Sequence, residues 1–363
     1  MKLTVVVFTS LALLAPGLAA QQPAEIPADS TRQAVNRFFV WPILGYAPET
    51  RFQFGIALGG MRRPAGWTDT DRPSGYSAVG ILTQRRQRLA QLSYDWWAPG
   101  NRWHVVANLG LLRFPADFYG IGLDTPDSSE RYTPRIGEGA LFVQRQVAPG
   151  RFVGGSLGLR DVAIVETVAG GRLDSGSVTG SRGGTLAWIG GELLVDERDN
   201  LFFPTGGRFA RITGFVSNGI WGSDFDLTRW GLEVRAYRSL GPRRVLAFNA
   251  QLDAVVGAAP FDWLPNLGGE RLVRGYVGTR YRDRALVAGQ VELRTAVWGR
   301  LGTALFVGAG SVARDVGSFR GARAVAGIGA RWLVNAAERF SLRLDMAWGS
   351  GSSGLYLGLG EAF

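Results

Sequence analysis

The residues best suited to specific chemistry form an arginine-rich segment that runs directly into an alternating one. Segment 265–284 reads PNLGGERLVRGYVGTRYRDR, and segment 285–294 follows with Gln290, Glu292 and Arg294 at every second position. In a strand these three side chains share one face. A guanidinium withdrawn from water is costly without a carboxylate partner. We therefore expect the first segment to be a loop that folds back into a polar interior, where an arginine meets a carboxylate.

Arg274, in the string Val-Arg-Gly-Tyr, is the expected cation of this loop. Glu292 is its first candidate partner, and Asp253 and Asp345 are the less favoured alternatives. Gly275 permits a positive φ or a close approach at the loop tip, and Tyr276 can pack its ring while its hydroxyl joins the network. The competing interpretation is an ordinary loop with solvated arginines.

The elements that would position this loop are strands, because short segments alternate between apolar and polar or small residues. In 52–58 the apolar set alternates with Gln53, Gly55 and Ala57; in 246–256 it alternates with Asn249, Gln251 and Asp253; in 340–348 it alternates with Ser341, Arg343 and Asp345. One oily and one polar face per segment is typical of a membrane β-barrel. A soluble β-sandwich or propeller also alternates, and is the weaker alternative.

Turn residues divide the chain from 38 to 363 into about sixteen strands, an even number that suits a membrane barrel. Short turns are expected at Ala47-Pro48, 98–101, 148–150 and Gly241-Pro242, and longer loops at 63–74, 123–132 and 170–184. We expect the short turns at one end of the barrel and the longer loops at the other.

Two further features favour a barrel. Aromatic residues gather near segment ends, where an interfacial girdle would lie: Tyr94, Trp96, Trp97, Trp103 and Trp221. The chain also finishes on an alternating segment, 355–363, whose terminal Phe363 resembles the recognition signal of outer-membrane barrels.

The N-terminus predicts export. Residues 1–20 combine Met1-Lys2, an apolar run and a small-residue exit, which is typical of a Sec signal peptide cleaved after Ala20. Residues 21–37 would be a short periplasmic stub, and 38–363 the barrel. The net charge of +10 comes almost wholly from arginine; after export it fits a solvated lumen and anionic lipid, including lipopolysaccharide, rather than nucleic acid.

The composition offers little for catalysis, and we expect no enzyme, cofactor or metal site. There is no cysteine and a single histidine, His104. Hydrolytic barrels need a histidine paired with Ser or Asp, and a lone one near a strand start is more often an interfacial side chain than a base. No nucleotide-binding or metal-spaced motif occurs.

Three motifs resemble the BamA/TamA superfamily of outer-membrane assembly factors. Segment 39–50 (FVWPILGYAPET) resembles the opening hairpin of members that lack periplasmic POTRA domains. Segment 196–207 (DERDNLFFPTGG) resembles a mid-barrel strand-turn-strand motif, and Val273–Tyr276 resembles the signature of the sixth extracellular loop. In the mid-barrel motif the polar residues are expected to tie the turn to the next strand, unless they are simply solvated; its candidate residues are Asp196, Arg198, Asp199, Pro204 and Gly206.

The resemblance has two departures. The family's Phe-x-Asp-x-Gly pattern appears here as Phe-Val-Gly-Ala-Gly at 306–310, so Gly308 removes one expected partner of Arg274 and leaves the task to Glu292. The stub of residues 21–37 is also too short for a POTRA domain, the usual receiver of client proteins.

The resemblance implies a barrel that assists insertion or translocation of proteins or lipids through a weak seam between its first and last strands. Its partners would be unfolded outer-membrane proteins or a periplasmic protein that takes the place of the missing receiver domains. The glycines Gly354, Gly358 and Gly360 would weaken the closing strand. The alternative is a passive, anion-favouring pore or a purely structural barrel.

Overall fold

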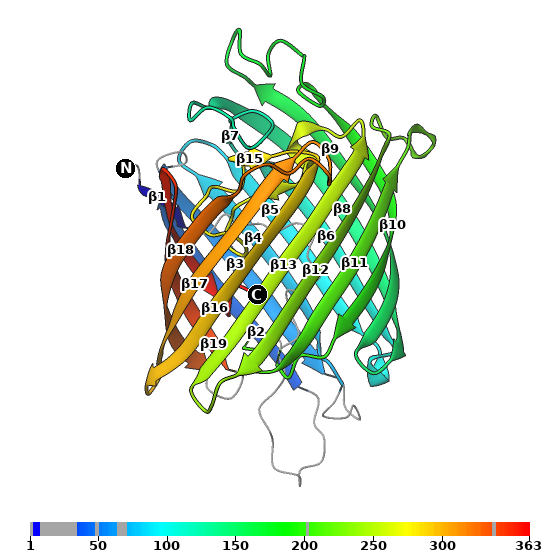
Figure 1. Ribbon diagram of the computed structural model, residues 1–363. Helices are drawn as coiled ribbons and strands as arrows, with labels where there is room; N and C mark the ends of the chain where they lie inside the picture. The colour runs from blue at the N-terminus through cyan, green and yellow to red at the C-terminus, as the bar shows by residue number, and fades with distance from the viewer. Residues whose placement is uncertain (1–2, 8–34, 48–50, 64–70, 201–202, 336–338) are drawn as a thin grey trace.

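The chain folds into a single β-barrel whose strands tilt steeply around a central lumen (Figure 1). The structure, a computed structural model, describes residues 3–7, 35–47, 51–63, 71–200, 203–335 and 339–363. Most of the predicted leader and stub lie outside these ranges, so cleavage after Ala20 stays a prediction. No helix in the described part is long and apolar enough to cross a membrane.

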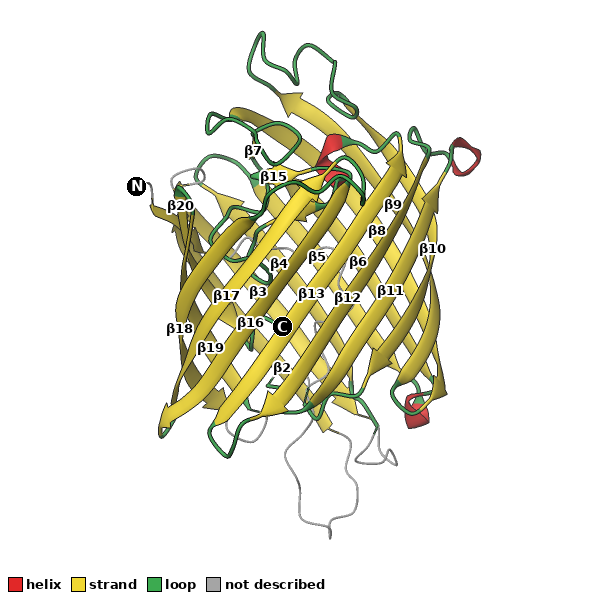
Figure 2. Ribbon diagram, in the orientation of Figure 1, coloured by secondary structure: helices red, strands yellow, loops and turns green. Residues whose placement is uncertain are grey.

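The large sheet has 18 strands, and three single-turn 3-10 helices lie in the connections (Figure 2). The elements are β1 (Leu3–Val7), β2 (Val35–Ala47), β3 (Arg51–Arg63), β4 (Ser74–Thr83), β5 (Arg88–Trp97), η1 (Pro99–Asn101), β6 (Trp103–Arg113), β7 (Ala116–Phe118), β8 (Glu130–Ala148), β9 (Arg151–Glu166), β10 (Gly183–Asp196), β11 (Gly207–Ser217), η2 (Gly219–Trp221), β12 (Leu227–Ser239), β13 (Arg244–Gly257), η3 (Phe261–Trp263), β14 (Asn266–Leu267), β15 (Tyr281–Arg282), β16 (Ala285–Trp298), β17 (Leu301–Ala313), β18 (Arg323–Asn335), β19 (Phe340–Gly349) and β20 (Ser352–Leu359).

Sixteen of these strands follow one another as antiparallel neighbours, from β2 through β6, β8 to β13 and β16 to β20. The prediction of about sixteen strands is therefore confirmed. Of the other two, β7 pairs with residues 130–132 at the start of β8, and β1 runs parallel to β20. The short pair β14–β15 forms a separate sheet within the connection 258–284.

The predicted alternation sets the two faces of the wall. On β3, Phe52 and Phe54 are exposed on the outside while Gln53 is buried. On β19, Leu344 and Trp348 are exposed while Asp345 is completely buried. An apolar exterior and a polar interior satisfy a bilayer on one side and a polar lumen on the other.

The directions of the strands show which end of the barrel each connection occupies, and they correct part of the expected separation of short turns from long loops. Connections 114–129, 167–182, 218–226 and 258–284 share one end, here the long-loop rim, at the top of Figure 1. The opposite short-turn rim carries 98–102, 149–150 and 240–243. However, β3 ends at the short-turn rim, because Arg62 pairs with Ser74 where β4 begins. The expected long loop after Arg63 therefore belongs to the short-turn rim and the Ala47-Pro48 turn to the other; residues 48–50 and 64–70 themselves lie outside the described ranges.

The aromatic girdle is present with one exception. Tyr94, Trp96, Trp103 and Trp221 are exposed, as a girdle requires. Trp97 is not part of it, because its side chain is buried and its ring stacks on His104 with centroids 3.8 Å apart. Two consecutive residues of a strand face opposite sides, so Trp96 and Trp97 cannot share the outer surface.

The end of the chain also differs from the expectation. β20 stops at Leu359 instead of continuing to Phe363, and the last residues turn into the lumen, where the C-terminus lies in Figure 1. Phe363 is buried in a cluster with Tyr237, Ala247 and Ala362. The aromatic terminal residue thus packs inside the barrel rather than on its outer wall.

The first and last strands of the meander, β2 and β20, have no ladder between them in the described residues. β20 pairs with β19 on one side, and its other edge pairs in parallel with β1, from Leu3 opposite Ser353 to Val7 opposite Leu357. No register joins β2 to β20 within the described ranges, where β2 pairs with β3. We call this interruption between β2 and β20 the seam.

Candidate functional site

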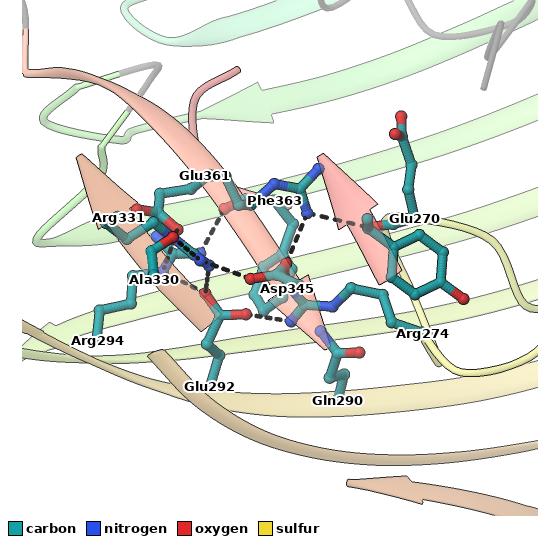
Figure 3. Close-up of polar contacts among 12 residues, drawn as sticks. Glu270, Arg274, Gln290, Glu292, Arg294, Ala330, Arg331, Asp345, Glu361 and Phe363 are labelled. Carbon is teal, nitrogen blue, oxygen red and sulfur yellow. Dashed lines mark hydrogen bonds and ion pairs between the residues drawn. The ribbon is translucent and has the colours of Figure 1, made fainter. Parts of the chain in front are cut away.

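The connection 258–284 folds down into the lumen and carries Arg274 against the wall. The side chain of Arg274 is completely buried, and its guanidinium bonds both Glu292 on β16 and Asp345 on β19 (Figure 3). It also lies 3.6 Å from the ring centroid of Phe306 on β17. The inward-folded loop predicted from the sequence is confirmed, and one cation bridges strands that are not neighbours.

Asp345 supplies the carboxylate that is missing at Gly308. Gly308 pairs with Gln290 on the neighbouring strand and has no carboxylate to offer. Asp345 lies two strands further along the wall, and its side chain has no exposed surface. Of the two less favoured alternatives, Asp345 is therefore the one that reaches Arg274, whereas Asp253 binds Arg229, with 2.6 Å between Asp253 Oδ2 and Arg229 Nη2.

Further charges extend this contact into a network, which the sequence reasoning missed as a unit. Arg331 Nη1 lies 2.5 Å from Asp345 Oδ1, and Arg343 Nη1 lies 3.1 Å from Asp345 Oδ2. Arg294 Nε donates to Glu292 Oε1 at 2.9 Å. The loop network, as named here, comprises Arg274, Glu292, Arg294, Arg331, Arg343, Asp345 and Glu361.

Four arginines and three carboxylates can remain buried together only because each charge has several partners. A buried ion is penalised by lost hydration, and the penalty is offset when hydrogen bonds of good geometry replace the water. The side chains of the network are at most 5% exposed. Arg294 and Arg343 could have been found from the sequence, because the alternation along β16 and β19 places them on the inner face. Arg331 and Glu361 join the network only through the curvature of the barrel.

The loop tip is fixed by backbone geometry as well as charge. Val273 has φ 54° and Gly275 has φ 127°. A positive φ is unusual for a β-branched residue and marks a constrained position; Val273 N is held by Gln290 Oε1 at 3.1 Å. The ring of Tyr276 lies against Gly349, where an added Cβ would fall 2.4 Å from Tyr276 Cζ. Glycine at position 349 therefore makes room for the tyrosine.

Where the loop enters the lumen, Arg271 lies among other arginines. Burial, reinforced by the neighbouring Arg235 and opposed by Glu233, lowers the pKa of Arg271 to about 10. Glu233 is itself bonded to Arg211 and Arg235, at 3.0 Å between Glu233 Oε2 and Arg211 Nη2. The lumen is thus rich in arginine, with carboxylates distributed among them.

The mid-barrel motif forms a compact turn at the short-turn rim. Arg198 binds Asp196 in bidentate fashion, with 2.7 Å from Nε to Oδ1 and 3.0 Å from Nη2 to Oδ2, and lies over Phe209 on β11. Asp199 Oδ1 accepts from the backbone of Thr205 at 2.8 Å and Gly206 at 3.1 Å. Pro204 is fully buried. Asp196 and Arg198 are therefore shielded from solvent, while Asp199 orders the exposed part of the turn.

A second buried group surrounds His104 on the opposite part of the wall. Nε2 of His104 lies 3.0 Å from Asp95 Oδ1, and Nδ1 lies 2.7 Å from Gln144 Oε1. Gln144 in turn bonds Glu192, and Trp97 stacks on the imidazole. We call these five residues the His104 cluster. The interpretation of His104 as an interfacial side chain is wrong: Trp103 faces outward, and His104, one position later, faces the lumen.

The described residues contain no group of three His, Cys, Asp or Glu side chains that could hold a metal ion.

Comparisons with known proteins agree with this geometry. The structure of BamA from Haemophilus ducreyi lacking POTRA domains 1–3 superposes with a TM-score of 0.60 at 15% identity, over 90% of this chain and 69% of that one. CdiB from Escherichia coli gives 0.60 at 13% identity, over 92% of this chain and 62% of its own. CdiB from Acinetobacter baumannii gives 0.56 at 13% identity, over 88% and 56%.

The chain therefore spans less than two thirds of either CdiB structure, and at these identities the likeness shows the fold alone. No curated protein sequence matches the chain. The model of the Omp85 superfamily domain matches residues 82–363, which include the mid-barrel motif, the inward loop and the seam strand β20. This chain belongs to the Omp85 superfamily and is an outer-membrane β-barrel of that assembly and translocation family.

Proposed function

We propose that this barrel assists the insertion or translocation of proteins or lipids at the outer membrane, and that the seam is where a client enters the bilayer. The barrel itself would be exported by the Sec pathway. The clients we favour are unfolded outer-membrane proteins, which a periplasmic partner would deliver to it. The structural relatives are named BamA and CdiB, and membership of the superfamily supports this class of function.

The observation that carries the proposal is the edge of β20. A ladder along both edges would fix a wall strand, as for β12, which pairs with β11 over residues 227–237 and with β13 over residues 227–239. β20 pairs fully only with β19, and its other edge takes the five residues of β1 in parallel. The five residues of β1 lie within the predicted signal peptide, so its cleavage would leave this edge of β20 unpaired. An unpaired strand edge is a template for another strand, so this edge would then have the chemistry to accept a segment of a client.

The test is assisted folding in liposomes. The purified barrel is reconstituted, and the insertion of an unfolded outer-membrane protein is timed against empty liposomes. We expect acceleration by the parent protein and its loss in Arg274→Ala. Arg113→Ala is the matched control, because it also removes one positive charge but from a half-exposed site at the long-loop rim.

Equal insertion rates with and without the parent barrel would overturn the proposal. Conductance measurements on the same vesicles examine the alternative of an anion-favouring pore. The arginines of the loop network weigh against that alternative, because carboxylates pair with them.

A further inference from the structure

The last strand is held from inside the barrel at two levels, one near each end. We propose that Tyr356 and Glu361 are positioning residues that fix β20 at the seam, and that the inward loop controls them, so that displacing the loop releases the strand. The biological use of this release rests on the proposed function. The coupling between the loop and β20 does not, because it depends on bonds that can be removed one at a time by substitution.

The upper level joins β20 directly to the loop tip. Gly275 N donates to Tyr356 Oη at 2.8 Å, and Ser352 Oγ donates to Gly275 O at 2.7 Å. Tyr276 Oη accepts from Ser350 N, in the turn before β20, at 2.8 Å. Tyr356 is buried. Three hydrogen bonds thus connect the two residues of the loop tip to the turn before the last strand and to the start and middle of that strand.

The lower level holds the segment that follows β20. Glu361 Oε2 lies 2.8 Å from Arg331 Nε and 3.5 Å from Arg294 Nε. Arg294 Nη2 also donates to the backbone oxygen of Phe363 at 2.8 Å, and its guanidinium lies 5.2 Å from the Phe363 ring centroid. Two wall arginines therefore bind this segment on the inner side of the wall; Figure 3 draws these contacts.

The two levels belong to one set of charges. Arg331 contacts Asp345 at 2.5 Å and Glu292 at 3.5 Å, and both carboxylates bind Arg274 of the loop. If the loop withdrew, both would lose their shared cation at once. Arg331 would then be drawn more strongly to them, and its contact with Glu361 would be altered. Coupling of this kind is expected where buried ions share partners, because no ion can leave without changing the balance of the others.

The side chains of β20 leave space for this arrangement. An added Cβ at Gly354 would fall 2.5 Å from Tyr356 Oη, and one at Gly358 would fall 2.6 Å from Arg343 Nη2. These glycines, expected to weaken the closing strand, also admit the tyrosine and the arginine that bind on its inner side. Because only the five residues of β1 pair with its other edge, the interior bonds supplement the incomplete backbone pairing of β20.

The experiment measures the position of β20 by paired spin labels. The chain contains no cysteine, so two substitutions define the label sites without further changes. Val40→Cys on β2 and Leu355→Cys on β20 report across the seam. Leu193→Cys and Ile212→Cys, which are cross-strand partners on β10 and β11, report on an ordinary part of the wall. Protein purified from outer membranes is reconstituted in lipid, and distance distributions are recorded for the parent, Arg274→Ala, Glu361→Gln and Tyr356→Phe.

We expect the seam pair to shift to longer distances and broaden in all three variants, with the control pair unchanged. Tyr356→Phe removes one hydroxyl and should fold even where Glu361→Gln does not. An unchanged seam distribution in Tyr356→Phe and Arg274→Ala would overturn the inference. So would an equal broadening of both pairs, because it would indicate general loosening of the barrel.

The result is independent of client insertion. A shifted seam together with no acceleration in the liposome assay would uphold the coupling and reject the proposed function. An unshifted seam together with acceleration would do the reverse.

Discussion

Two buried polar groups line this lumen, and they are built differently. The His104 cluster joins β5, β6, β8 and β10 through side chains of the wall alone. The loop network joins a connection to β16, β18 and β19 and to the segment after β20, across sequence separations of up to 71 residues. The first supports strands that are already paired along both edges, whereas the second holds a loop and a strand that lack such pairing. Charge is concentrated where the ladder of backbone hydrogen bonds is incomplete.

The largest expected effect comes from removing the shared cation of the loop network. Arg274→Ala leaves Glu292 and Asp345 with fewer partners in a buried site, and breaking a buried pair in this way costs about 3–5 kcal/mol. Equilibrium urea unfolding in lipid vesicles, followed by tryptophan fluorescence, measures the loss. Arg274→Lys keeps the charge but not the planar, two-sided geometry, and should lie between the parent and the alanine variant. If Arg274→Ala lost less unfolding free energy than His104→Ala, the loop network would not be the more important of the two groups for stability.

A crowding mutation examines the same loop without altering charge. Gly349→Ala places a methyl group into the ring of Tyr276, and overpacking of this kind costs about 2–3 kcal/mol. We expect increased protease cleavage within 265–284, because the loop tip can no longer seat. The double variant Gly349→Ala/Tyr276→Ala should recover part of the stability; no recovery would mean that another contact is responsible.

The His104 cluster should respond more weakly and locally. His104→Ala removes two hydrogen bonds and a stacked ring and leaves polar partners unsatisfied, a loss of about 1–2 kcal/mol. The seam labels should not move in this variant. His104→Gln is the control that retains hydrogen-bonding capacity. A shift of the seam labels in His104→Ala would show that the His104 cluster and the loop network are coupled and do not act independently.

The smallest effect is expected for an ion pair outside both groups. Arg113 Nη2 and Glu166 Oε1 are 3.2 Å apart, with side chains 49% and 63% exposed. Exposed pairs contribute roughly 0–1 kcal/mol and are screened by salt. Glu166→Gln should therefore leave the urea midpoint nearly unchanged at low and high salt. A loss comparable to that of His104→Ala would show that burial is not what distinguishes the buried groups.

Much of the barrel follows from the sequence because the rule that governs it is local. A strand turns alternate side chains to opposite faces, so 52–58 and 340–348 by themselves predict an oily wall and a polar lumen. Glycine and proline mark the turns, which yields the strand number. The pairing of Arg274 with Glu292 was accessible too, since a buried guanidinium requires a carboxylate and the next strand offers one on its inner face.

The tertiary structure alone decided which distant residues meet. Successive strands alternate in direction, so the rim at which a connection lies depends on its place in the strand order. The length of the connection after Arg63 therefore could not predict its rim. Closure of the wall brings β19 within reach of a loop that precedes β16, and this made Asp345 a partner of Arg274. The inward turn of Glu361 and Phe363 depends on arginines from β16 and β18, which no local pattern near the C-terminus reveals. Alternation along a strand is a property of the backbone, whereas contact across the lumen depends on the curvature of the whole sheet.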